Sequence, residues 1–187
     1  MARYIGYYLQ SILGDNMAET AKTVYGGKVI IASRPLAKQG TDAGLKFAFE
    51  TTHNYKKSRD SKATATKSGT VNAQGTLETT LKVEMVANDG DVIKMQEAAM
   101  NSGEKMEYWR IFTGVSGSAE GTVKATYMQG TVTSFEEDAD ADAFSTASVE
   151  VAVDGIPVDG EVTFDASTTD SQYGFTGIEK VTTPPAG

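Results

Sequence analysis

The sequence predicts a mainly β protein: an antiparallel β-sandwich or small barrel with one flanking α-helix and a long extended loop. Three observations predict this class. Short runs rich in Val, Ile, Thr and aromatic residues recur between glycine-containing turns. Several of these runs alternate apolar and polar residues, which is the period of a half-buried strand. One internal segment follows helical spacing instead.

The predicted strands begin after Gly26 and Gly27 with the run KVIIAS, residues 28–33. The segment 76–86, TLETTLKVEMV, gives the clearest alternation, with Leu81, Val83 and Met85 on one face and charged residues on the other. The remaining predicted strands are 45–52, with Phe47 and Phe49 on one face, 105–112, a strand pair within 122–136 kinked or bulged at Gly130, 145–155, and 158–164, with Asp159-Gly160 as a turn signal.

The helix is predicted from about residue 90 to residue 101. Asn88 or Asp89 could cap its start with a short side-chain oxygen, and Gly103 suits the left-handed residue just past a helix end. Helical spacing then places one apolar stripe against the sheet, and we expect Ile93 and Met100 to be buried in it. The stripe consists of Val92, Ile93, Gln96, Ala99 and Met100.

The chain of 187 residues suggests one domain with appendages. We predict an N-terminal extension at 1–21, a β domain at 22–165 and a C-terminal tail at 166–187. The extension carries no clear secretion signal, and Met17 is an alternative natural start. No stretch has the roughly 20 apolar residues of a membrane helix. A short helical stripe in the extension could dock on a surface: Ile5, Tyr8, Leu9, Ile12 and Leu13.

The segment 53–75, HNYKKSRDSKATATKSGTVNAQG, has almost no large apolar side chains. A structureless loop of this length is unusual in a compact domain unless it is functional or disordered. We therefore predict a long extended loop, which could be a functional site, a linker or an arm that orders on meeting a partner.

No catalytic, cofactor or metal site is predicted. The chain has one histidine, His53, and no cysteine, and it lacks a G-x-S-x-G elbow, a phosphate-binding loop and a dinucleotide fingerprint. The run EEDADAD resembles the start of a calcium loop, but Ala143 and Val149 stand where an EF-hand needs Gly and Glu. Trp109 could form a sugar-binding platform, although an aromatic residue in an alternating strand is more often in a core or an interface.

Charge is segregated along the chain, whose net charge is −8. Such a protein as a whole repels nucleic-acid phosphates. Opposite charges on separate segments suit head-to-tail self-association. The alternative is two unrelated solvated segments. The predicted inter-subunit contacts are the basic Lys56, Lys57, Arg59, Lys62 and Lys67 and the acidic Glu136, Glu137, Asp138, Asp140 and Asp142.

Several stretches together resemble a known family. KSRDSKATATKSGTV follows KFAFETTHN, and SGEKMEYWRIF and then YMQGTVTSFE come later. In this order they resemble the major tail protein family of phages with long, non-contractile tails that infect Gram-positive bacteria. The likeness covers about residues 22–160, and the basic Ser/Thr-rich stretch is its most specific part.

The resemblance implies a structural virion protein without cofactor or enzymatic activity. Six copies would form a ring, and rings assembled in the host cytoplasm would stack into a tail tube that conducts DNA without binding it specifically. The segment 53–75 would reach the next ring, and tape measure and tail terminator proteins would be further partners. Two other classes stay open: a carbohydrate-binding or adhesin module using Trp109, and a hydrolase with a carboxylate mechanism.

Overall fold

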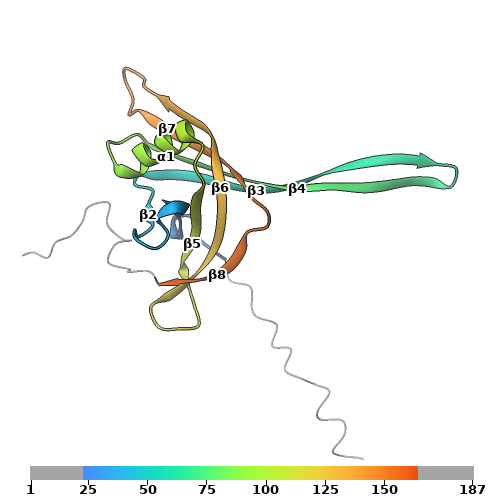
Figure 1. Cartoon of the computed structure of the whole chain (residues 1–187), viewed down its shortest axis with the longest axis horizontal. Helices are drawn as coiled ribbons and strands as arrows, with labels where there is room; N and C mark the ends of the chain where they lie inside the picture. The colour runs from blue at the N-terminus through green and yellow to red at the C-terminus, as the bar shows by residue number, and fades with distance from the viewer. Residues whose placement is uncertain (1–22, 164–187) are drawn as a thin grey trace, which may run out of the picture.

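The computed structural model of the chain describes residues 23–163. They form one sheet with a helix against it, from which one long hairpin projects (Figure 1). The elements are η1 (Gly26–Lys28), β1 (Val29–Pro35), η2 (Leu36–Lys38), β2 (Leu45–Lys46), β3 (Glu50–Thr66), β4 (Gly69–Val86), α1 (Asp91–Ser102), β5 (Met106–Ser116), β6 (Thr122–Asp138), β7 (Thr146–Val153) and β8 (Val158–Thr163).

The sheet has the order β2-β1-β5-β6-β7-β4-β3, and β8 also pairs with β6. Every pair is antiparallel, and the sheet does not close into a barrel. The mainly β class with one helix is therefore confirmed. β6 connects the two halves of the sheet, because its first part pairs with β5 and β8 and its second part with β7.

The core lies on one face of the sheet, as the alternation predicts. Leu81, Val83 and Met85 of β4 are buried, and Val149 and Val151 of the neighbouring β7 lie beside them in register. Cross-strand pairs of this kind stabilise a sheet through contact between directly opposed side chains. The charged residues of β4 point to the other face, which is wet.

Helix α1 covers one end of this core. Its start and end differ by one residue from the prediction, and Ile93 is buried as expected. Gly103 has φ 71°, which confirms the left-handed residue after the helix. No side chain caps the start; instead the Asn88 side chain accepts a hydrogen bond from Gly90 N and donates one to the Val86 carbonyl.

Met100 departs from the prediction, because 40% of it is exposed. The buried stripe centres on Gln96 and Ala99, and Met100 lies about 100° around the helix from Ala99, at the edge of that stripe. It also lies in the last turn.

A buried polar chain fixes α1 to the sheet. The Tyr108 hydroxyl of β5 donates to Gln96 Oε1 at 2.7 Å, and Gln96 Nε2 donates to Ser33 Oγ of β1 at 2.9 Å. All three residues are buried, so these bonds satisfy polar groups that would otherwise cost about 1–3 kcal/mol each. Burial also raises the pKa of Tyr108, which keeps its hydroxyl protonated as a donor.

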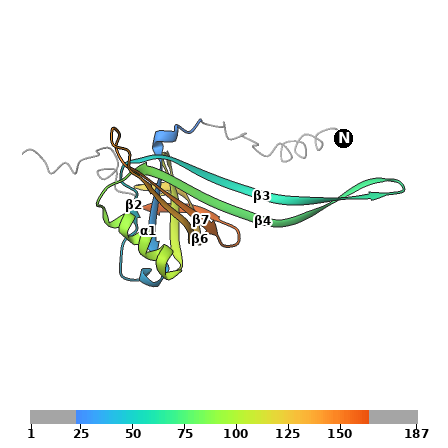
Figure 2. The same ribbon diagram turned by 90° about the horizontal axis from the view of Figure 1, so that it is seen from above.

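The predicted loop at 53–75 is wrong: this segment is the greater part of a β-hairpin. β3 and β4 pair from Glu50↔Met85 out to Thr66↔Gly69, and a tight turn at Lys67 and Ser68 joins them. The hairpin extends well beyond the body of the molecule in both views (Figures 1 and 2). Backbone pairing, rather than a hydrophobic core, orders its outer part, since residues 60–74 are all exposed.

Three further strand predictions need correction. The segment 45–52 breaks after the two residues of β2: Phe47 is fully buried, whereas Phe49 has φ 55° and is 42% exposed. Residues 122–136 lie in one continuous strand, β6, whose register shift falls between Val132 and Ser134 rather than at Gly130. Asp159 and Gly160 lie within β8, and the chain turns before it, at 154–157.

Candidate functional site

The five predicted basic residues all lie on the projecting hairpin, and all are exposed. Strand alternation places Tyr55, Lys57 and Arg59 on the side that faces the core, with Lys56 on the opposite side. Lys57 Nζ lies 5.4 Å from the centre of the Tyr55 ring, and Arg59 Nη1 donates to the Gly75 carbonyl at 3.1 Å. Lys62 lies beyond a register shift in β3, and Lys67 lies in the turn.

The five predicted acidic residues lie at the opposite side of the body. Glu136, Glu137 and Asp138 end β6, and Asp140 and Asp142 lie in the connection to β7. All five are exposed. Phe144 follows them in the same connection and is 85% exposed.

The structure does not bring the basic and acidic sets together within one chain. The hairpin and the β6–β7 connection project from different parts of the body (Figure 1). No member of either set forms an ion pair within residues 23–163. Both sets are therefore available to another molecule.

The hairpin also exposes an unpaired edge. β3 ends the strand order, so one side of its 17 residues has no partner strand among the described residues. Lysines on such a strand disfavour uncontrolled pairing. A two-stranded hairpin without a covered face is marginal in water, so the outer hairpin suits a segment that gains stability on meeting a partner.

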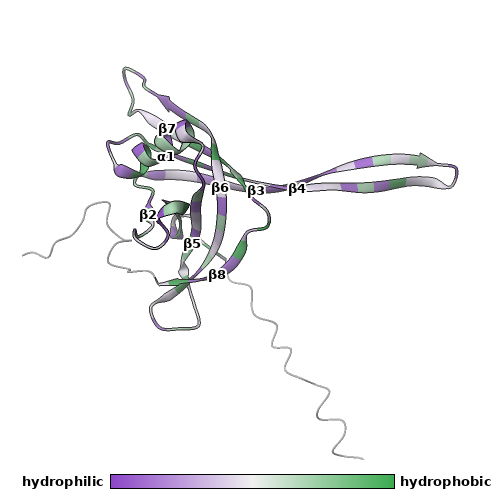
Figure 3. Cartoon of the chain, in the orientation of Figure 1, coloured by the Kyte–Doolittle hydropathy of each residue, from purple (hydrophilic) through white to green (hydrophobic). Residues whose placement is uncertain are grey.

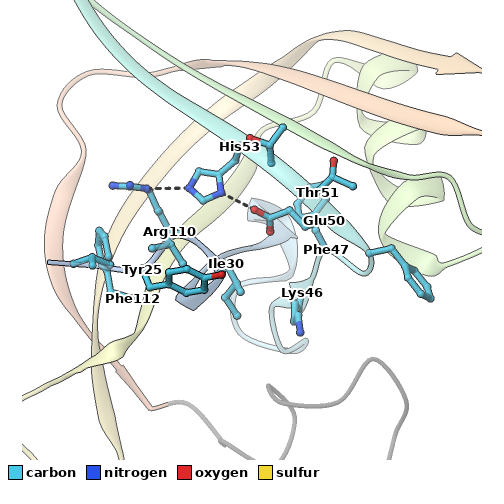
Figure 4. A pocket seen from close by; sticks show the side chains of 15 residues that line it. Tyr25, Ile30, Lys46, Phe47, Glu50, Thr51, His53, Arg110 and Phe112 are labelled. Carbon is cyan, nitrogen blue, oxygen red and sulfur yellow. Dashed lines mark hydrogen bonds and ion pairs between the residues drawn. The ribbon is translucent and has the colours of Figure 1, made fainter.

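His53 takes part in a cluster that ties the hairpin base to the sheet (Figure 4). Arg110 Nε can only donate, so its contact with His53 Nε2 at 3.3 Å places the imidazole proton on Nδ1, which donates to Glu50 Oε1 at 2.6 Å. Glu50 Oε2 accepts a hydrogen bond from Ile31 N at 3.0 Å. This histidine is thus a structural link between β3 and β5.

An open concave region lies beside this cluster, between the hairpin base and β5. Its larger part has a volume of about 1030 Å³ and includes the exposed Tyr25 and Phe49. A smaller part of about 540 Å³ reaches β6 and β8. Arg110 and Phe112 border both parts, and Arg110 stacks on the Phe112 ring at 4.8 Å. Burial lowers the pKa of Arg110 from its ordinary value, although the Tyr55 phenol and the Asp159 carboxylate oppose that effect.

Sequence reasoning missed a buried charged network around Trp109. Glu107 is fully buried and accepts hydrogen bonds from Arg34 at 2.7 and 2.9 Å and from the Tyr127 hydroxyl at 2.6 Å. Arg34 covers one face of Trp109 at 5.0 Å, and the Tyr127 ring lies 5.6 Å away. The alternating pattern of β5 could have placed Glu107 beside Trp109, but not its partners from β1 and β6.

This packing disfavours a carbohydrate-binding role for Trp109. A sugar platform needs an open ring face, and here Arg34 covers one face and Gly44 packs near the ring edge. In the described part of the chain, no three His, Asp or Glu side chains gather closely enough to hold a metal ion. No helix within residues 23–163 is long and apolar enough to cross a membrane.

Comparison with protein families gives the assignment. The model of the family described as phage tail tube protein matches residues 23–159, which is most of the chain. The chain belongs to the phage tail tube protein family. It is therefore a structural component of a virion tail, and the carbohydrate-binding alternative is not favoured. No curated protein matches the sequence.

Solved structures share the tail tube fold. The SPP1 tail tube is 16% identical, with a TM-score of 0.64 over 84% of this chain and 88% of that one. The tail of an empty gene transfer agent particle, refined with C6 symmetry, is 13% identical, with a TM-score of 0.56 over 74% and 98%. The PVC sheath-tube complex, an extracellular contractile injection system, is 11% identical, with a TM-score of 0.51 over 76% and 95%. At these identities the likeness concerns the fold alone.

Proposed function

We propose that copies of this tail tube protein form rings that stack into a hollow tube, and that the hairpin joins one ring to the next. The observation that carries the proposal is the outer hairpin itself. It is ordered by backbone pairing, covers no core of its own and projects far from the body. An element of this kind gains stability when a second subunit covers it.

Charge complementarity supports the same contact. The proposal pairs Lys56, Lys57, Arg59, Lys62 and Lys67 with the acidic residues Glu136, Glu137, Asp138, Asp140 and Asp142 of an adjacent subunit. Single exposed ion pairs contribute about 0–1 kcal/mol each. Several such pairs repeated around a ring add up to enough to control stacking.

The proposed tube conducts DNA without retaining it. Anionic walls repel phosphates, whereas cationic walls bind them by releasing counterions. The wet face of β4 and β7 offers a candidate lining, because Glu84 and Glu150 lie near Lys82 there. Lys82 Nζ pairs with Glu84 at 2.8 Å, so the face keeps a negative balance.

The finer parts of the proposal rest on the family resemblance. They are rings of six subunits, assembly in the cytoplasm of a Gram-positive host, and contact with tape measure and tail terminator proteins. The chain is proposed to act without enzymatic turnover. Hydrolysis of a defined substrate by pure protein, lost when one carboxylate is changed, would contradict that part.

Electron microscopy of purified protein over a range of concentrations tests the assembly proposal. We expect rings or tubes, and we expect no tubes from a variant in which a two-residue turn replaces residues 60–76. That variant keeps the hairpin base with Tyr55 and His53, so its melting temperature should stay close to that of the parent. Monomers of the parent protein at every concentration would overturn the proposal.

A further inference from the structure

The smaller part of the concave region is a groove with an aromatic floor and a basic rim. Tyr55 of β3 and Phe112 of β5 provide the aromatic surface, and Arg110 lies over both rings at 5.5 and 4.8 Å. Three cationic side chains border the groove against one carboxylate, Asp159. The cationic residues are Lys57, Arg110 and Lys124, and smaller apolar surfaces come from Val24, Val115 and Ala125.

This lining determines which ligand the groove suits. The aromatic rings favour an apolar side chain, and three cations against one carboxylate favour groups of negative charge beside it. The groove therefore suits an apolar side chain flanked by carboxylates.

The β6–β7 connection presents that combination. Phe144 is 85% exposed, the highest exposure among the large hydrophobic residues of the described chain. Five carboxylates precede it, from Glu136 to Asp142. Aromatic side chains that enter a pocket on a partner often carry much of the binding energy of an interface, and surrounding charges set its specificity.

The two surfaces lie at opposite ends of one strand. Lys124, Ala125 and Thr126 near the start of β6 border the groove, and Asp138 ends the same strand. Twelve residues of strand separate Thr126 from Asp138, which is a contour of about 40 Å. The tip of one chain therefore does not reach its own groove, and the two can meet only between copies in a head-to-tail contact.

We propose that Phe144 of one copy inserts into the groove of the next copy, where its acidic neighbours face Lys57, Arg110 and Lys124. This inference rests on the proposed self-assembly and identifies an apolar anchor and its receptor within it. The anchor complements the charge contact, because Lys57 belongs both to the hairpin and to the groove.

Cysteine pairs test the contact directly, because the chain has no cysteine of its own. Phe144→Cys combined with Val115→Cys should give a ladder of disulfide-linked oligomers when assembled tubes are oxidised. Glu97→Cys on the exposed side of α1, combined with Val115→Cys, is the matched control and should give no ladder. A ladder of equal yield from both pairs would overturn the inference.

Segment 1–22 is the competing occupant, since it joins the described chain beside Val24 at the groove. The cysteine pair Thr20→Cys and Val115→Cys distinguishes this occupant from Phe144 of another copy. A link within single chains from this pair, with none from the Phe144 pair, would assign the groove to that segment and overturn the inference.

Truncation provides a second measurement. Phe144→Ala should raise the protein concentration needed for assembly at least tenfold, whereas Ile156→Ala, a similarly exposed position in the β7–β8 turn, should leave it unchanged. Both variants should keep the parent melting temperature. Normal assembly by Phe144→Ala would overturn the proposed insertion of Phe144 and leave the proposed function in place. A parent protein that never assembles would overturn the proposed function.

Discussion

Ile93 shows how much one side chain in the interface between α1 and the sheet contributes to stability. It is 5% exposed and belongs to the main core cluster. Ile93→Ala leaves a cavity and should lower the free energy of unfolding by about 2–5 kcal/mol, measured by denaturant titration. Met100→Ala is the matched control on the same helix and should cost clearly less, because Met100 is 40% exposed. Equal losses would contradict the observed orientation of the helix.

Gly130 is required where β6 passes close to β7. A Cβ built there would collide with the carbonyl oxygen of Ala152 and with the side chain of Val151. Gly130→Ala should therefore destabilise the protein by about 1–3 kcal/mol, as overpacking does. Gly160→Ala in β8 meets nothing within 4 Å and should be close to neutral. Thermal unfolding of both variants checks the pair, and a neutral Gly130→Ala would mean that the two strands can move apart.

At the scale of elements, the basic residues of the β3–β4 hairpin are predicted to be required for tube growth. Lys56→Glu with Lys57→Glu and Arg59→Glu should leave the monomer folded, because these side chains are exposed, and should block tube growth. Exchanging Lys and Arg at the same three positions keeps the charge and is the control. Tube growth should also slow with added salt. The Debye length is about 8 Å at physiological ionic strength and becomes shorter as salt is added, so the ion pairs between subunits weaken.

Charge reversal on the partner segment completes this test. Replacing Glu136, Glu137 and Asp138 with Lys in the triple variant should restore part of the growth. Normal tubes from the triple variant alone would remove the hairpin charges from assembly. Absence of rescue would show that the hairpin contacts a different acidic surface.

The turn between β5 and β6 depends on one carboxylate of β8. Glu161 accepts hydrogen bonds from Ser118 N at 2.8 Å and from the Ser118 and Thr122 hydroxyls at 3.0 Å. The Ser118 backbone bond is the main cause of the lowered pKa of Glu161. Since the folded pKa lies below the ordinary 4.5, this anchoring is complete above that pH and is lost as the pH falls through the folded value. The protection of the Ser118 amide from hydrogen exchange, relative to its intrinsic rate at the same pH, should fall there, and Glu161→Gln should show reduced protection already at neutral pH.

The elements with a strong hydrophobic period were predicted correctly from the sequence. The outer hairpin was not, because backbone hydrogen bonding between its two strands, rather than a buried face, forms it. Alternation located β7 and the part of β4 at 76–86, and helical spacing with Gly103 located α1 within one residue. The outer hairpin is polar on both faces, so it has no period-2 signal, and hydropathy along it is mixed (Figure 3). Its β-branched runs on either side of Lys67, ATAT and GTV, were the available clue.

The candidate site was predictable in part for the same reason. Charge counting found both charged segments, because each is contiguous in the sequence. The groove was not predictable, because Tyr55, Phe112 and Lys124 come from three strands that only the fold brings together.

At the scale of the whole molecule, charge predicts how the assembled protein treats DNA. The net charge is −8 although the segment 53–75 carries +4, which leaves −12 on the rest of the chain. If the basic hairpins pair with the five acidic residues at 136–142 of neighbouring subunits, the rest of the chain still carries −7, so the remaining surfaces are anionic. Purified tubes should therefore retain little duplex DNA at ~150 mM salt in a co-sedimentation assay. The variant with Lys56, Lys57 and Arg59 changed to Glu, which should not assemble, is the control for DNA binding by the unassembled protein. Tight retention of DNA by tubes would contradict the proposal that the tube conducts DNA without holding it.

The arrangement of β6, with a groove at its start and an exposed phenylalanine at its end, gives each subunit a direction. A stack built through that contact has two chemically different ends, one with empty grooves and one with bare Phe144 tips. Subunits would then add at different rates to the two ends, as in any polar filament. A protein that seals one end by imitating the tip would not bind the other, so the length of such a filament can be set from a single side.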